Sequence, residues 1–300
     1  MSNFIYDLNG DVLVFGENYH GQLGLGYYRN VNIPTLLMND TTIKNIICGG
    51  FHTIIYKNNG DVLVFGYNDD GQLGLGHHKN IDVPTLLMND TTIKNIICGT
   101  FHTIIHKNNS DVLVFGGNYY GQLGLGYNND VNVPTLLMND KTIKNIICGR
   151  NHNIIYKNNG DVLVFGNNDY GQLGLGHNND INSPTLLMND KCIKNIICGD
   201  LHTIIYKDNG DILVFGDNDE GQLGLGHTNN IEFPTLLMNN PYIKSINGIE
   251  IMRWSIENFK DLSILEQERI KIFYYCLKHI QIQTSLKIPK FVIYEILKFI

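Results

Sequence analysis

Short apolar runs alternate with polar, glycine-rich segments along most of this chain. Residues 43–92 show one full cycle, with four runs rich in β-branched and aromatic side chains: Ile43–Cys48, His52–Lys57, Val62–Phe65 and Thr85–Met88. Such runs, bounded by Gly, Asn, Asp and Pro, predict short β-strands, which we call A, B, C and D. The Asn-Gly pair between B and C is a strong hairpin signal because both residues tolerate positive φ. A proline directly before D fits a strand start, where its missing N–H is tolerated.

Strand C is apolar on both of its faces. Its four residues, Val62–Phe65, are all hydrophobic, which suits a sheet that is covered on both sides. Burying each such side chain stabilises a fold by about 1.5–3 kcal/mol, and an isolated sheet has no neighbour to cover it. The pattern therefore predicts that successive sheets stack on one another.

The whole cycle repeats every 50 residues. The hexapeptide Gly-Gln-Leu-Gly-Leu-Gly occurs five times without insertion or deletion, beginning at Gly21, Gly71, Gly121, Gly171 and Gly221. A fixed period of this size is typical of repeat architectures, and four short strands per repeat are typical of a β-propeller blade. The predicted fold class is therefore an all-β propeller, and a solenoid is the alternative arrangement.

The two ends of the repeat region predict how the ring closes. Phe4–Gly10 aligns with Ile54–Gly60, so the chain begins in a B strand, whereas the last recognisable strand, Ile243–Gly248, is an A strand. Together they would complete one blade beside four intact ones, which predicts about five four-stranded blades closed by pairing of the terminal strands. The predicted domains are a propeller over residues 1–250 and an α-helical tail over residues 251–300.

Charge and cysteine content narrow the class of protein. Asp and Glu number 29 against 22 Lys and Arg, for a net charge of -7, so direct binding of nucleic acid is disfavoured. No stretch approaches 18 uncharged apolar residues, and we expect no membrane span. The N-terminus has no signal-peptide pattern, and four of the six cysteines are one copied repeat position. We expect an intracellular protein, cytoplasmic or nuclear, in the host cell if the source is viral.

The repeat unit resembles the RCC1 repeat (regulator of chromosome condensation). The shared motifs are Cys-Gly-x-x-His-Thr, then Asn-Gly-Asp-Val-Leu-Val-Phe-Gly, then Gly-Gln-Leu-Gly-Leu-Gly, and finally Pro-Thr. The resemblance is complete over residues 48–84, and related copies cover about residues 4–248. WD40 repeats would show Trp-Asp dipeptides, and kelch repeats would show a tryptophan per blade. This chain has only Trp254.

The resemblance implies a β-propeller, although the best-known members of the family have seven blades. Founding-type members exchange guanine nucleotide on a small GTPase, using a face that includes a wedge-like insertion. Every repeat here keeps its 50-residue length, so we expect no wedge. Photoreceptor-type members carry Gly-Trp-Arg-His-Thr, and the matching segments, such as Gly49–Thr53, lack the tryptophan. That function is therefore not expected.

Candidate chemical motifs favour structure over catalysis. Cys-x-x-x-His occurs four times, as in Cys48/His52, but the pairs lie on different blades, so packing and turn hydrogen bonds are favoured over zinc. The Gly-x-Gly pattern lacks the Lys-Ser/Thr of a phosphate loop, and Asp217–Gly221 lacks the spacing of a calcium loop. No nucleophile, base and orienting group form a triad pattern. We expect no enzyme, no cofactor and no metal.

Differences between the copies concentrate in two connections, the A–B turn and the C–D loop. In an antiparallel blade both connections emerge on one rim, while the nearly invariant B–C and D–A turns emerge on the other. Loops on a rigid scaffold commonly carry recognition, although neutral drift is the alternative. Tyrosines mixed with carboxylates suit a protein partner that is partly basic. The candidate partner-binding residues are Tyr19, His20, Phe51, Asp69, Asp70, Phe101, Tyr119, Tyr120, Arg150, Asn151, Asp169, Tyr170, Asp219 and Glu220.

The sequence changes character after Ile251. Leu262, Leu265 and Phe273 begin an apolar helical face, and a second helix is predicted from about Pro289. These helices are interpreted as a cap on the propeller. The alternative is an adaptor, because Ile288–Ile300 resembles the opening of an F-box or related motif that recruits ubiquitin-ligase machinery.

Three functions follow from these patterns. The favoured one is a non-catalytic scaffold that binds a protein through the variable connections. The second is a ubiquitin-ligase substrate adaptor that uses the tail, and the third is a regulator of nucleotide exchange on a small GTPase.

Overall fold

Each repeat forms one antiparallel sheet in the order A–B–C–D. The structure, a computed structural model, describes residues 2–240. The first sheet has three described strands, β1 (Ser2–Tyr6), β2 (Asp11–Gly16) and β3 (Val31–Asn39). The second has β4 (Ile43–Cys48), β5 (His52–Lys57), β6 (Asp61–Gly66) and β7 (Ile81–Asn89). The remaining strands are β8 (Ile93–Cys98), β9 (His102–Lys107), β10 (Asp111–Gly116), β11 (Val131–Asn139), β12 (Ile143–Cys148), β13 (His152–Lys157), β14 (Asp161–Gly166), β15 (Ile181–Asn189), β16 (Ile193–Cys198), β17 (His202–Lys207), β18 (Asp211–Gly216) and β19 (Ile231–Asn239).

The predicted strands are confirmed, with one correction in strand D. Instead of starting after Pro84, β7 begins at Ile81. Near this end of the strand, Val64 of β6 pairs with Thr85, and Gly66 pairs with Ile81. Two residues of β6 therefore correspond to four residues of β7, so β7 contains two extra residues here. Pro84 lies in the resulting bulge, where the ladder does not need its missing N–H. The apolar run alone did not reveal this extension.

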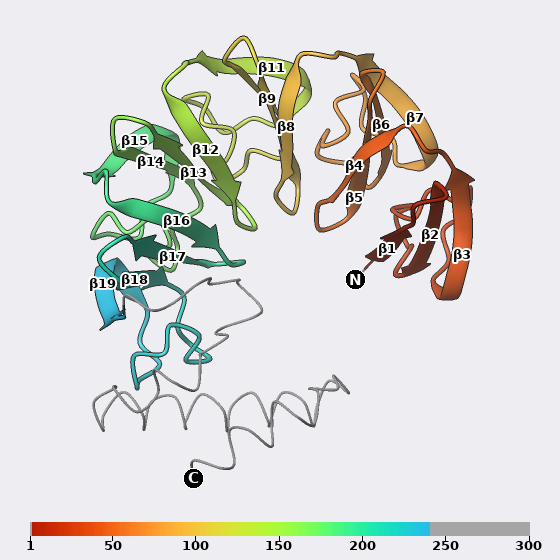
Figure 1. The fold of residues 1–300 in the computed structure, drawn as a ribbon. Coiled ribbons are helices and arrows are strands. Elements are labelled where there is room, and N and C mark those ends of the chain that lie inside the picture. Colours follow the sequence, from red (N-terminus) through yellow and green to blue (C-terminus); the bar gives the residue numbers. More distant parts are fainter. Residues whose placement is uncertain (1, 241–300) are drawn as a thin grey trace.

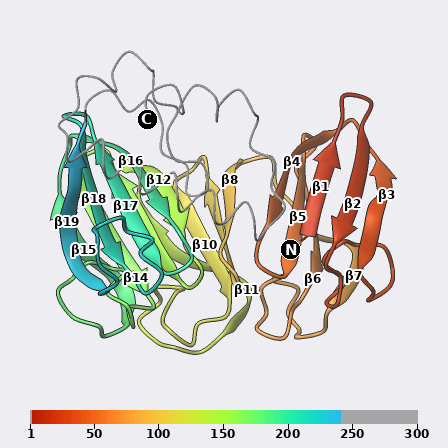
Figure 2. The same cartoon turned by 90° about the horizontal axis from the view of Figure 1, so that it is seen from below.

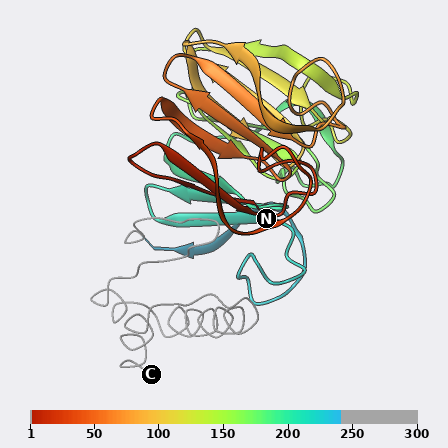
Figure 3. The ribbon, with the colours of Figure 1, turned by 90° about the vertical axis from the view of Figure 1, so that its right-hand side faces the viewer.

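The five sheets stand side by side as the blades of a propeller, numbered 1 to 5 along the chain (Figure 1). The A strands β4, β8, β12 and β16 line the inside of the arc, and each contacts the next. The D strands lie on the outside (Figure 1). Seen from two perpendicular directions, the strands run between two rims that carry the connections (Figures 2 and 3). This radial arrangement is a propeller, not a solenoid.

The core lies between the blades, as the apolar C strands predict. Val62 and Val64 on β6 face the third blade and are fully buried in one cluster with its Phe115. Phe65 faces the opposite way and is fully buried in a second cluster with residues of the first blade. Alternate residues of one strand therefore fill two different interfaces, and each interface repeats with the period of the sequence.

The middle glycine of the repeated hexapeptide is part of this interface. Gly74 has a φ of +70°, and a Cβ built there would lie 2.9 Å from the ring of Phe115 on the next blade. A side chain would therefore suffer both an unfavourable backbone conformation and a steric clash. The same relation joins Gly24 to Phe65, Gly124 to Phe165 and Gly174 to Phe215. The hexapeptide is a packing device that is copied with each blade.

The first and last blades stand at the two ends of an arc (Figure 1). Ile5 on β1 is 46% exposed, whereas its four counterparts, Ile55, Ile105, Ile155 and Ile205, are fully buried. The strand predicted to close the ring, Ile243–Gly248, lies outside the described residues. The predicted boundary at residue 250 and both tail helices lie outside them too, so these remain predictions.

Candidate functional site: the variable rim

The two variable connections of each blade meet on one rim. In blade 2 the N–H of Tyr67, which opens the C–D loop, donates to the carbonyl of Phe51 in the A–B turn at 2.9 Å. The corresponding bond recurs in blades 3, 4 and 5. The invariant turns meet in the same way, because Asp90 N–H in the D–A turn donates to the carbonyl of Gly60 in the B–C turn at 2.7 Å. We call the first set of connections the variable rim.

The variable rim is tied together across the blades by a buried polar clasp. His52 Nε2 lies 3.0 Å from Thr103 Oγ1 of blade 3, and that hydroxyl donates to the carbonyl of Gln72 in blade 2 at 3.0 Å. Since the hydroxyl proton is used in this way, the imidazole must carry its proton on Nε2 and donate it. The ring fills the space where a Cβ at Gly49 would stand. This accounts for the repeated Gly-x-x-His motif.

The clasp recurs with one change of partner. In blades 3 and 4, His102 Nε2 donates to Asn153 Oδ1 at 2.9 Å, and Asn153 Nδ2 donates to the carbonyl of Gln122 at 2.7 Å. Burial lowers the pKa of His102 to about 4 and that of His52 to about 3, so both rings are neutral near pH 7. His52, His102 and His152 therefore link neighbouring blades, a structural role consistent with the packing and hydrogen bonding expected of the Cys-x-x-x-His motif.

No metal centre accompanies these cysteines and histidines in residues 2–240, where no group of three or more ligating side chains gathers. The five described cysteines are free thiols. Burial raises the pKa of Cys198 to about 12. No helix within the described range has the length and apolarity needed to cross a membrane.

Each C–D loop is fixed by a buried asparagine. Asn118 Oδ1 accepts the N–H of Leu123 at 2.8 Å, and its Nδ2 donates to the carbonyl of Tyr127 at 2.7 Å. These bonds span most of the loop and leave Tyr119 and Tyr120 at its tip. The two rings are in edge-to-face contact, with centroids 4.9 Å apart. Since buried hydrogen bonds hold the loop, the tyrosines are presented by a preorganised backbone.

The A–B turns are joined to one another along the inner edge of the rim. Arg150 N–H donates to the carbonyl of Asp200 at 3.1 Å, and Thr100 N–H donates to the carbonyl of Arg150 at 3.0 Å. The backbone of Arg150 is thus held from both sides, while its side chain is exposed.

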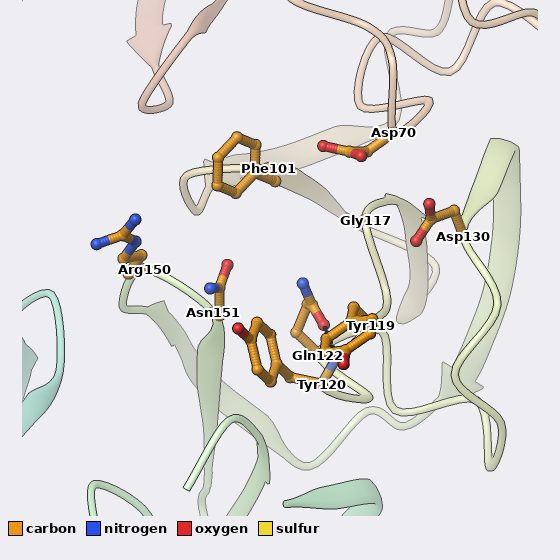
Figure 4. A pocket seen from close by; sticks show the side chains of 9 residues that line it. All are labelled: Asp70, Phe101, Gly117, Tyr119, Tyr120, Gln122, Asp130, Arg150 and Asn151. Atoms are coloured by element: carbon orange, nitrogen blue, oxygen red, sulfur yellow. Dashed lines mark hydrogen bonds between the residues drawn. The ribbon is translucent and has the colours of Figure 1, made fainter. Parts of the chain in front are cut away.

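Three neighbouring blades enclose a pocket of about 460 Å³ on the variable rim (Figure 4). Blade 2 contributes one loop residue, blade 3 contributes both of its connections, and blade 4 contributes its A–B turn. We call this the rim pocket. It is lined by Asp70, Phe101, Gly117, Tyr119, Tyr120, Gln122, Asp130, Arg150 and Asn151.

The rim pocket has opposite charges on opposite sides. The carboxylates of Asp70 and Asp130 lie on one side, and the guanidinium of Arg150 lies on the other (Figure 4). Burial, and then the nearby carboxylates of Asp130 and Asp69, raises the pKa of Asp70, although His78 opposes this shift. Between the two sides, Asn151 is only 8% exposed, and its Oδ1 has no hydrogen-bond partner.

Six of the 14 predicted site residues therefore meet in the rim pocket. His20 and Phe51 instead pack together over blades 1 and 2, with ring centroids 5.4 Å apart. The others occupy the same loop tip on their own blades, outside the pocket, and most of them are exposed: Tyr19, Asp69, Asp169, Tyr170, Asp219 and Glu220. The structure gathers the predicted residues on one rim without joining all of them in one site.

Three pocket residues were missed by the sequence analysis. Gly117 and Asp130 lie in the C–D loop and do differ between copies, but only the residue pair at the tip of each loop was selected as a candidate. Gln122 is identical in every copy, and a search for variable positions therefore discards it. Its Oε1 accepts the N–H of Tyr120 at 3.0 Å, and its side chain lines the pocket.

Comparison with known proteins identifies the family to which this architecture belongs. The family model of the RCC1-like domain matches residues 2–259. Among solved structures, human WBSCR16 has 24% identity and a TM-score of 0.66, with 79% of this chain and 65% of that chain covered. Yeast RCC1 (Prp20), solved with Kap60, has 21% identity and a TM-score of 0.70, with 80% and 60% covered.

Prp20p from Saccharomyces cerevisiae, in another structure, has 21% identity and a TM-score of 0.68, with 80% of this chain and 62% of that chain covered. This chain spans less than two thirds of the length of these proteins. No curated protein sequence matches it. Since the family model covers every described blade, the chain belongs to the RCC1-like domain family of β-propellers.

Proposed function

We propose that this protein is a non-catalytic scaffold that binds a protein partner through the variable rim. The observation that carries the proposal is the rim pocket, where residues that differ between copies meet on a frame that does not differ. Folding alone does not require tyrosine, carboxylate and arginine side chains to gather at one place. Recognition of a partner would explain why they do.

The composition of the rim pocket supports a protein as the partner. Tyrosine and arginine are enriched at protein interfaces and at their energetic hot spots. Tyr119 is 76% exposed and rests edge-on against Tyr120, so it offers apolar area to a partner with little further ordering. The fixed backbones of both connections reduce the entropy lost on binding.

Affinity purification of the full chain, followed by mass spectrometry, tests the proposal. Replacing Tyr119, Tyr120 and Arg150 together by Ala should remove the specific partners. The matched control is Lys141→Ala, because Lys141 is exposed in a D–A turn on the opposite rim. Retention of every partner by the triple variant, with the same profile as the control, would refute binding through this rim.

Regulation of a small GTPase is the second candidate. It is favoured by the family and by the fold shared with yeast Prp20p, a protein whose structure was reported with its binding to Gsp1p and histones. The C–D loops here are equal in length, without the wedge-like insertion of the exchange factors. A nucleotide-release assay on candidate GTPases tests this function, and an unchanged release rate removes it.

The ubiquitin-ligase adaptor remains a prediction from Ile288–Ile300, which lies outside the described residues. Deleting residues 285–300 should abolish co-purification of ligase components if the adaptor prediction is right. Unaltered co-purification would exclude it.

A further inference from the structure

One residue of the C–D loop distinguishes the filled space beside blade 2 from the open space beside blade 3. At the position of Gly117, the other copies carry Glu17, Tyr67, Asn167 and Asp217. In blade 2, the ring of Tyr67 lies 4.8 Å from that of His20 and 6.0 Å from that of Phe101, centroid to centroid. Side chains fill the space there.

Blade 3 has no side chain at this position. A Cβ built on Gly117 would lie 3.4 Å from the Cβ atoms of both Asp70 and Phe101, which is ordinary contact distance, and its backbone does not have a positive φ. A larger residue would therefore be tolerated by the fold and would project between the walls of the rim pocket. The glycine is not required by the backbone, and its effect is to keep the pocket open.

The open pocket also carries two carboxylates that are not in ion pairs. The position of Asp130 is Asn in blades 1, 2 and 5, and only blades 3 and 4 place a carboxylate there. Its Oδ1 accepts the N–H of Asn118 at 2.7 Å, a bond that asparagine makes equally well in blade 2 (Asn80 to Asn68, 2.6 Å). The charge is therefore not needed for the loop. In residues 2–240, neither Asp70 nor Asp130 is in an ion pair.

A buried acceptor completes the site. Asn151 Oδ1 is buried and has no donor, and a buried acceptor without a donor is unfavourable. The corresponding residues are Phe51, Phe101 and Leu201, so only blade 4 places a polar group there. The donor that this oxygen lacks would come from a ligand.

We propose that the rim pocket receives an arginine side chain of the protein partner, an inference that rests on the proposed function. A guanidinium presents five N–H donors in one plane. They match the two carboxylates and the Asn151 oxygen, while Phe101 and the tyrosines supply aromatic surface for stacking. Arg150, on the far side, is placed to meet a carbonyl or carboxylate of the same partner segment.

The test is an NMR titration of the full-length, ¹⁵N-labelled chain with capped Gly/Ser heptapeptides that differ only in a central Arg, Lys or Glu. The Arg peptide should shift the signals of pocket residues in a saturable manner. Asp130→Asn should weaken its binding about tenfold, because one charge-assisted hydrogen bond is lost. Gly117→Tyr, which copies blade 2, should abolish binding.

Asp180→Asn is the matched control. Asp180 accepts the N–H of Asn168 at 2.7 Å, as Asp130 does in its own blade, but it does not line the rim pocket. Its substitution should leave binding unchanged. If Gly117→Tyr fails to fold, the Asp70→Asn/Asp130→Asn double variant replaces it in the test.

Three results would overturn the inference: binding of the Glu peptide alone, equal binding of Lys and Arg peptides, and no binding of any peptide. The result is separable from the proposed function. If the triple rim variant loses its cellular partners while the Asp70→Asn/Asp130→Asn variant keeps them, partner binding through the rim stands and arginine recognition fails.

Discussion

The interfaces between blades and the variable rim above them are built from the same repeats by opposite rules. At the interfaces, the first four copies each place the same glycine against the phenylalanine of the next blade, and Phe65, Phe115, Phe165 and Phe215 are all fully buried. On the rim, no two copies present the same pair of residues at the tip of the C–D loop. The residues that repeat therefore stabilise the contacts between blades, and the residues that differ give the rim a surface that changes from blade to blade.

Acidification should affect the interfaces most strongly. Burial lowers the pKa values of His52, His102 and His152 to about 3, 4 and 3, below the value of about 6.5 expected in the unfolded chain. Below pH 6.5 the unfolded chain binds more protons, so stability falls towards pH 4, by up to about 1.4 kcal/mol per pH unit for each histidine. Thermal unfolding at pH 7, 6 and 5 measures this fall. An unchanged Tm would contradict neutral, buried histidines.

Removing a phenylalanine between two blades is the next largest effect. Phe115→Ala should lower the free energy of unfolding by about 3–5 kcal/mol, because it leaves a cavity beside Gly74 and Leu73. Urea unfolding followed by circular dichroism measures the change. A loss below 1 kcal/mol would show that the interface repacks around the cavity. We do not expect this, because the backbone at Gly74 is closely packed against the ring.

An interior blade and the first blade should respond differently to the same substitution. Ile105→Ala should cost about 2–5 kcal/mol because Ile105 is fully buried. Ile5 is 46% exposed, and Ile5→Ala should cost less than about 1 kcal/mol by simple area. Paired urea unfolding curves compare the two variants. Equal costs would instead support the ring closure predicted from the sequence, since a closing strand would cover Ile5.

Changes in the polar clasp should have intermediate effects that depend on the hydrogen bonds kept. Thr103→Val leaves His52 Nε2 and the Gln72 carbonyl unpaired and should cost about 1–3 kcal/mol. Asn153→Thr should be nearly neutral, because threonine fills the same position in blades 2, 3 and 5. Hydrogen exchange and thermal unfolding of the two variants measure the difference. Equal losses would show that the clasp is not the source of the stabilisation.

The smallest stability effect is expected on the rim. Tyr119→Ala removes a side chain that is 76% exposed and should change the free energy of unfolding by no more than about 0.5 kcal/mol. Partner binding should nevertheless decrease. A stability loss comparable to that of Phe115→Ala would mean that the rim belongs to the folding core and would remove the distinction between the two regions.

Much of the fold could be predicted from the sequence because it depends on local patterns. The apolar runs of strands A, B and C, the Asn-Gly turns and the 50-residue period each act within one repeat. The extension of β7 to Ile81 could not be predicted in this way. Pro84 reads locally as a strand start, and only pairing with β6 shows that a bulge carries the ladder past it.

The candidate site, too, could be predicted only in part from the sequence. Comparison of the copies identified the rim and six residues of the rim pocket, because an alignment of the repeats is enough to show which positions vary. The pocket itself depends on Asp70, Gly117 and Asn151, which come from three different blades. The number of residues between them in the sequence does not predict how far apart they lie in the fold. The repeats by themselves determined the blades and the rim that varies, whereas packing of three blades around a missing side chain decided where that rim is hollow.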